Sequence, residues 1–145
     1  MEKILLYARV DLNKTNYAEL ENYRFIYYPD IDQLNQLYYE YCRYKKFRSV
    51  MPIFDSEYTS KDTDIIGYYD ENNLIAFSLI KRYSNFDAEC IQFAWNYSNP
   101  KLKLGKASLK NECAIYKKMK FRYLYLGGAD EYKKDIDGFE ILGPA

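Results

Sequence analysis

The stretch NYSNPKLKLGKASLKNECAIYKKMKFRYLYLGG, residues 96–128, has the pattern of a loop, a helix and a buried strand. Its turn-rich start leads into Gly105-Lys106-Ala107-Ser108 and then into an amphipathic run. The run predicts a helix whose buried face carries four residues at helical spacing: Leu109, Cys113, Tyr116 and Met119. Residues 121–126 then form a short apolar run, which predicts a strand. This order presents a helix N-terminus, which attracts anions.

Positive charge gathers in the same region. Residues 101–122 hold eight lysines and arginines and one acidic residue, Glu112, although the whole chain has a formal net charge of zero. Two interpretations stay open at this point. The lysines either form a solvated helix face or provide a local field for phosphate groups.

Composition excludes several kinds of site. The 145 residues, 48% of them hydrophobic, predict one compact domain over residues 1–145. Histidine is absent, so no Ser-His or Cys-His nucleophile pair and no HExxH zinc site can form. Three widely spaced cysteines, Cys42, Cys90 and Cys113, give no metal motif, and we expect no metal. No apolar run reaches about 18 residues, so we expect no membrane segment and a cytoplasmic protein.

The first half of the chain predicts a strand at 1–10, a short extended piece at 24–28 and a helix at 30–48. Asp30 and Gln33 have the spacing of a capping box at the start of that helix. Residues 49–63 break the pattern and could hold a short second helix and a substrate loop. Residues 64–69 and 74–83 predict a hairpin around the turn 70–73, where asparagines tolerate a left-handed backbone.

Residues 89–95 predict a further strand by their alternation. The pattern assigns Ile91, Phe93 and Trp95 to one face and Cys90, Gln92 and Ala94 to the other. Three antiparallel strands would then be followed by a crossover, through the helix after residue 104, to a parallel strand at 121–126. The tail predicts a short turn at 129–134 and a last strand at 138–142.

This order of elements resembles the GNAT acyltransferases, and residues 102–107 are similar to the pyrophosphate loop of that family, Gln/Arg-x-x-Gly-x-Gly/Ala. Gly105 and Ala107 occupy the two small positions, while Leu102 replaces Gln or Arg. The resemblance implies an α+β fold, a single domain with a mixed, mostly antiparallel twisted sheet flanked by helices. It also implies acetyl-CoA as co-substrate, with its pyrophosphate held by residues of the loop: Lys103, Leu104, Gly105, Lys106 and Ala107.

The same resemblance implies roles for three more residues. The strand that ends at Trp95 would pair with the pantetheine arm, and an amine would attack the thioester directly. Tyr132 is the matching position for the general acid and Glu89 the nearest candidate for the base. Either residue could instead be structural, Tyr132 in packing and Glu89 as a surface carboxylate. The acceptor would be an amine-bearing small molecule, a protein N-terminus or a lysine, and exposed tyrosines would suit a homodimer.

The region also resembles the catalytic domain of aminoacyl-tRNA-protein transferases, through residues 96–100, Leu104-Gly105, Glu112 and residues 123–127. That resemblance implies an alternative in which aminoacyl-tRNA is the donor and tRNA a partner. A third possibility is a GNAT-shaped binding module without catalysis. The absence of histidine and of Gln or Arg at position 102 favours considering it.

Overall fold

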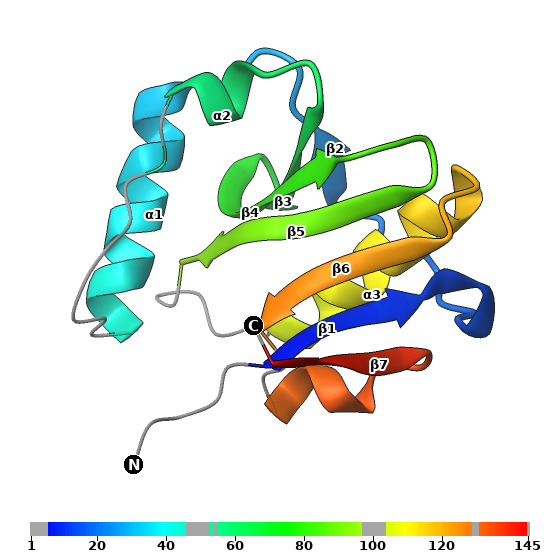
Figure 1. The fold of residues 1–145 in the computed structure, drawn as a ribbon. Helices are drawn as coiled ribbons and strands as arrows, with labels where there is room; N and C mark the ends of the chain where they lie inside the picture. The colour runs from blue at the N-terminus through cyan, green and yellow to red at the C-terminus, as the bar shows by residue number, and fades with distance from the viewer. Residues whose placement is uncertain (1–5, 46–52, 54, 97–103, 129–130, 145) are drawn as a thin grey trace.

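The computed structural model describes residues 6–45, 53, 55–96, 104–128 and 131–144 (Figure 1). Seven strands, three α-helices and two described 3-10 helices follow one another in this order: β1 (Leu6–Asp11), η1 (Leu12–Lys14), β2 (Tyr23–Phe25), α1 (Ile31–Lys45), α2 (Asp55–Thr59), β3 (Thr63–Asp70), β4 (Asn73–Arg82), β5 (Asp87–Trp95), α3 (Leu104–Lys118), β6 (Tyr123–Gly128), η3 (Glu131–Asp135) and β7 (Phe139–Pro144). No helix of these residues is both long and apolar enough to cross a membrane.

The strands form a single sheet in the order β2-β3-β4-β5-β6-β1-β7. Strands β5 and β6 pair in parallel through the α3 crossover, and the other described neighbours pair antiparallel. The predicted fold class is therefore confirmed. The sequence pattern did not indicate that β1 lies between β6 and β7, as Figure 1 shows.

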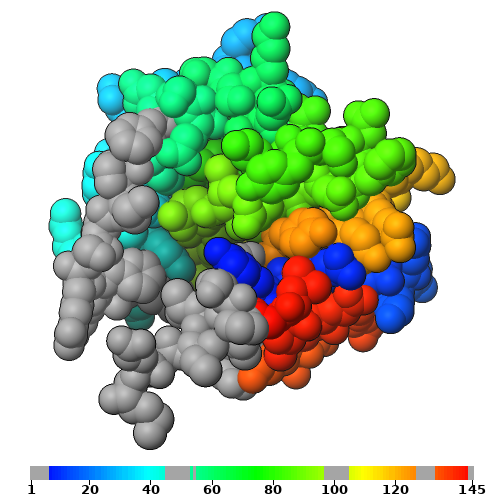
Figure 2. Space-filling view, viewed as in Figure 1, coloured from blue at the N-terminus to red at the C-terminus, as the bar shows by residue number. Residues whose placement is uncertain are grey.

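Helices cover the sheet unequally. Helix α3 packs on one face, where Val10, Tyr116 and Leu124 are fully buried. On the other face, α1 and α2 cover β3, β4 and β5 through a second cluster that includes Leu34 and Phe77. No helix of the described residues covers β6, β1 and β7 on that second face, and Figure 2 shows β6 (orange) at its surface.

Two local predictions in the first half of the chain are confirmed. The backbone N–H of Gln33 donates to Asp30 Oδ1 at 3.1 Å, so Asp30 caps α1. The short second helix is α2, whose Tyr58 is buried against the core.

The hairpin turn differs from the expectation in one respect. The residue with a left-handed backbone is Glu71, at φ 57°, rather than an asparagine. Asp70 pairs with Asn73, so the loop has two residues, and such loops need a positive φ at their first position. The geometry of the loop therefore decides which residue takes the left-handed conformation.

The strict alternation predicted for residues 89–95 is wrong. Ile80 pairs with Cys90 but Leu79 pairs with Gln92, so a bulge places Ile91 as an extra residue in β5. Cys90, Phe93 and Trp95 consequently pack toward the α3 side of the sheet, whereas Ile91 packs in the cluster under α1.

The predicted burial of Met119 is also wrong, because α3 ends one residue earlier, at Lys118. Lys120 adopts φ 70°, and the N–H of Phe121 donates to the carbonyl of Tyr116 at 2.9 Å. These are the features of a Schellman motif, which turns the chain out of the helix. Met119 is left 44% exposed, and Phe121 is buried in its place.

Candidate functional site

Strands β5 and β6 pair only at their beginning. Their parallel register ends at Glu89 opposite Tyr125, whereas β5 continues to Trp95 and β6 to Gly128. Figure 1 shows the two strands diverging from that point. We call the Glu89–Tyr125 pair the vertex. Beyond the vertex, β5 has backbone groups with no described partner strand on the β6 side, so an extended ligand could pair there.

Small residues keep the start of α3 accessible. Gly105 lies in the first turn, and a Cβ built on it would meet nothing within 4 Å. Ala107 follows, and Ser108 turns its hydroxyl back to the Gly105 carbonyl at 2.9 Å. The first turn has no acidic residue. An anion could therefore approach the backbone amides of this helix N-terminus without a side chain in the way.

The other predicted loop residues are placed only in part. Lys106 Nζ lies 2.8 Å from Asp135 Oδ2, an ion pair that joins α3 to η3. The hydrogen bond from Lys106 lowers the pKa of Asp135. Lys106, which was predicted to lie near the phosphate groups of the cofactor, therefore already forms an ion pair with the Asp135 carboxylate. Lys103 lies outside the described residues, and so does the side chain of Leu104, whose backbone begins α3.

Comparisons with known proteins bear on this arrangement. No family sequence model and no curated protein sequence matches the chain. Solved structures do match. The GCN5-related N-acetyltransferase from Kribbella flavida superimposes with a TM-score of 0.56 at 13% identity, over 96% of this chain and 54% of that one. The chain has the GNAT fold.

Two further structures of this kind are similar. Saccharomyces cerevisiae N-myristoyltransferase, solved with bound myristoyl-CoA, gives a TM-score of 0.64 at 11% identity over 96% of this chain and 48% of that one. L-PGS from Bacillus licheniformis gives a TM-score of 0.65 at 19% identity, over 88% of this chain and 48% of that one. The chain spans about half the length of the L-PGS chain it matches. These comparisons do not support tRNA as a partner or a homodimer.

Of the two predicted catalytic residues, the structure describes the side chain of Glu89 but not that of Tyr132. Glu89 lies at the vertex, where it accepts a hydrogen bond from the Tyr83 hydroxyl. That bond, together with burial, raises the pKa of Tyr83 to about 12. Tyr132 belongs to η3, but its side chain lies outside the described part of the chain. Trp95 ends β5 opposite Ala76 and packs against the α3-side core.

A buried carboxyl lies behind the vertex. Glu112, on α3, is 3% exposed and lies 2.5 Å from the Tyr68 hydroxyl and 2.9 Å from Ser78 Oγ, both through Oε2. Its Oε1 lies 3.6 Å from Cys90 Sγ. Burial raises the pKa of Glu112 to about 7, and the three hydrogen bonds oppose this rise.

The same cluster fixes the first half of α3. The Tyr68 hydroxyl lies 3.2 Å from the Ser108 carbonyl oxygen and accepts a hydrogen bond from Asn111 Nδ2 at 3.1 Å. Asn111 Oδ1 accepts the backbone N–H of Leu20 at 2.6 Å. Strand β3 and the segment before β2 therefore hold the helix whose N-terminus faces the open end of the strand pair.

Sequence reasoning noted Glu112 as the one acidic residue of the basic stretch and through a family resemblance, but it did not connect Glu112 with its partners. A signal was present: Ser108, Asn111 and Glu112 are polar, yet they stand beside the buried Leu109 and Cys113 on the same helix. Polar residues on an apolar helix face are expected to be hydrogen-bonded inside the protein. The pattern could have indicated an internal network, but its partners on β3 and β4 come only from the tertiary structure.

Proposed function

We propose that this chain is an acyl-CoA-dependent N-acyltransferase, with acetyl-CoA as the donor. The observation that carries the proposal is the combination of diverging β5 and β6 with an α3 N-terminus that has open space at Gly105. The unpaired edge of β5 would take the pantetheine arm, and the helix start would take the pyrophosphate. The residues present fit such a donor because nothing described blocks Gly105.

The reaction needs positioning and two proton transfers. The acceptor nitrogen attacks the thioester carbonyl carbon, a C–N bond forms, and the C–S bond breaks. The ammonium proton passes to a base, and the leaving sulfur receives a proton to become the CoA thiol. We propose Glu89 as the base, because it stands at the vertex on the face that α3 does not cover. Tyr132 remains the proposed acid.

The test is direct binding of CoA and acetyl-CoA, measured by calorimetry. Gly105→Glu places a carboxylate where the pyrophosphate would lie, and we expect it to weaken binding by about 100-fold or more, from charge repulsion and lost access. The fold should survive, since a Cβ at Gly105 meets no other atom within 4 Å. Gly105→Ala is the matched control, because it adds a Cβ without charge.

Absence of binding of either compound to the wild-type chain at millimolar concentration would overturn the proposal and favour a GNAT-shaped binding module. Equal binding by wild type and Gly105→Glu would leave a CoA-binding protein but refute the location of the pyrophosphate. Thermal unfolding of each variant, followed by circular dichroism, separates loss of the site from loss of the fold.

A further inference from the structure

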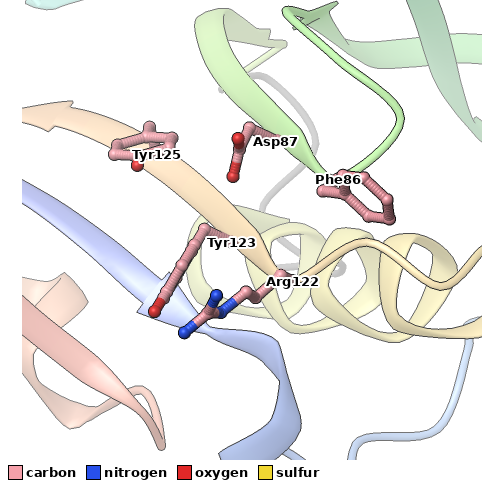
Figure 3. Close-up of a pocket in the computed structure, with 5 residues that line it drawn as sticks. All are labelled: Phe86, Asp87, Arg122, Tyr123 and Tyr125. Atoms are coloured by element: carbon pink, nitrogen blue, oxygen red, sulfur yellow. The ribbon is translucent and has the colours of Figure 1, made fainter.

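A pocket lies on the face of β5 and β6 that is turned away from α3. An open pocket of about 440 Å³ is lined by five residues: Phe86, Asp87, Arg122, Tyr123 and Tyr125. Figure 3 shows Asp87 projecting from β5 between the rings of Phe86 and Tyr125, with the side chain of Arg122 turned toward the Tyr123 ring. The residues between them, Ala88 and Leu124, are fully buried on the α3 side. A pocket of this volume is within the range that holds small ligands.

The pocket begins at the vertex. Tyr125 is the strand partner of Glu89, and Asp87 precedes Glu89 by two residues on the same face of β5. A ligand in the pocket would therefore lie beside the proposed base. In the proposed reaction the acyl group arrives at this point from the opposite, diverging end of the strand pair.

The two charged groups of the pocket are not paired with each other. Asp87 Oδ2 accepts a hydrogen bond from Ser84 Oγ at 3.3 Å, and Arg122 lies 4.8 Å from the centre of the Tyr123 ring. Within the described residues neither forms an ion pair. Arg9 differs: it lies 3.8 Å over the same ring, but its Nε is 2.9 Å from Glu140 Oε2. The pocket thus offers one negative and one positive group to a ligand.

Aromatic surface completes the pocket. Phe86 is 61% exposed although it is a large apolar side chain, and Tyr125 is half-buried across from it. The backbone of this region is well held, because the Phe86 carbonyl accepts the N–H groups of Arg122 at 2.8 Å and Tyr123 at 3.2 Å. A ligand with an apolar body would cover part of this aromatic surface and remove it from water.

We infer that this pocket binds the acyl acceptor, and that the acceptor is a free α-amino acid with an apolar or aromatic side chain. The geometry places the ammonium group at Asp87, beside Glu89, and the carboxylate at Arg122, whose guanidinium suits a carboxylate. The side chain lies on the exposed ring of Phe86. The role as acceptor rests on the proposed function, whereas binding of the amino acid does not.

The test measures binding of amino acids and their analogues in the absence of CoA, by calorimetry or by ligand-observed NMR. L-phenylalanine should bind, and two analogues should bind about 10-fold more weakly or worse: phenethylamine, which lacks the carboxylate, and 3-phenylpropionate, which lacks the amine. Each analogue loses one charged contact, and such contacts contribute more than neutral ones.

Variants assign each contact to its residue. Asp87→Asn should weaken L-phenylalanine by about 10-fold and leave 3-phenylpropionate unchanged. Arg122→Gln should weaken L-phenylalanine and leave phenethylamine unchanged. Asp137→Asn and Lys61→Gln remove the same charges from exposed positions outside the pocket and should bind like the wild type.

Several results would overturn the inference. Failure of L-phenylalanine to bind, equal binding of phenethylamine, or equal effects of the pocket and control variants would each do so. Separate measurement of CoA distinguishes the two proposals. Amino acid binding without CoA binding retains the pocket and refutes the acceptor role, while CoA binding without amino acid binding refutes the pocket and retains the proposed function.

Discussion

The two faces of the sheet carry similar polar residues, but these residues are buried on one face and open to solvent on the other. On the α3 face, Glu112, Tyr68 and Ser78 are buried and satisfy one another. On the other face, Asp87 and Arg122 stand in an open pocket without an ion pair among the described residues. The difference arises from coverage by a helix. A carboxyl sealed under α3 stabilises the arrangement of the helix, whereas a carboxyl left uncovered remains available to a ligand.

The largest expected effect is the pH dependence contributed by Glu112. Its folded-state pKa of about 7 lies above the ordinary value of 4.5, so the folded protein binds this proton more tightly than the unfolded chain. The stabilisation is fully present below about pH 4.5 and is lost as the pH rises through 7. The loss is on the order of 3 kcal/mol of unfolding free energy.

Urea unfolding of the wild type and of Glu112→Gln at several pH values measures this effect, because the glutamine cannot titrate. The wild type should lose stability relative to the variant between pH 4.5 and 8. If the unfolding free energies of the two proteins changed with pH in parallel, Glu112 would have the same pKa in the folded and unfolded states. The predicted pH dependence would then be wrong.

The next effect is that of Tyr68→Phe, which deletes the hydroxyl between Glu112, Asn111 and the Ser108 carbonyl. We expect a loss of about 2 kcal/mol, because a hydrogen bond to a charged group is removed and buried partners are left unsatisfied. The loss should be greater at pH 8 than at pH 5, since this bond lowers the pKa of Glu112.

Tyr27→Phe is the matched control, because Tyr27 is 79% exposed. The same deletion there should change the unfolding free energy by less than about 0.5 kcal/mol. Equal losses in the two variants would refute a special role for the buried hydroxyl network.

The smallest effect on stability is expected at the vertex. Glu89→Gln should change the unfolding free energy by less than about 0.5 kcal/mol. Position 89 is partly exposed, and the amide oxygen of a glutamine there can still accept the hydrogen bond from the Tyr83 hydroxyl. Under the proposed function, turnover of an amine acceptor should nevertheless fall by about 100-fold or more. Glu40→Gln, on the exposed side of α1, is the control. Unchanged turnover would remove Glu89 from the mechanism.

Local patterns in the sequence predicted much of the fold. Apolar periodicity located α1, α3 and the β3–β4 hairpin, because each buries a face against its neighbours. The Asp30 cap and the parallel crossover followed from spacing and element order. The start of α3 at the Gly105 region was predicted for the same reason, since small residues at a helix start have a clear physical meaning.

Features that depend on distant parts of the chain could not be predicted in this way. The bulge at Ile91 comes from the pairing of β5 with β4, and Met119 is exposed because a Schellman motif ends α3. The pocket could not be predicted, because the sequence does not show that β6 lacks a covering helix on that face among the described residues. Tyr123 and Tyr125 are therefore exposed to the pocket. The catalytic assignments of Tyr132 and Glu89 stay predictions.

The position of β1 between β6 and β7 has a consequence for how the chain folds. Arg9 on β1 contacts Glu140 on β7 although 131 positions separate them, and β1 also pairs with β6. Strand β1 is synthesised before β6 and β7 and can pair only after both have been made. This half of the sheet therefore has a high contact order and is expected to form slowly. Until then the backbone groups of β1 are unpaired, and a nascent chain would be most prone to aggregate through this strand.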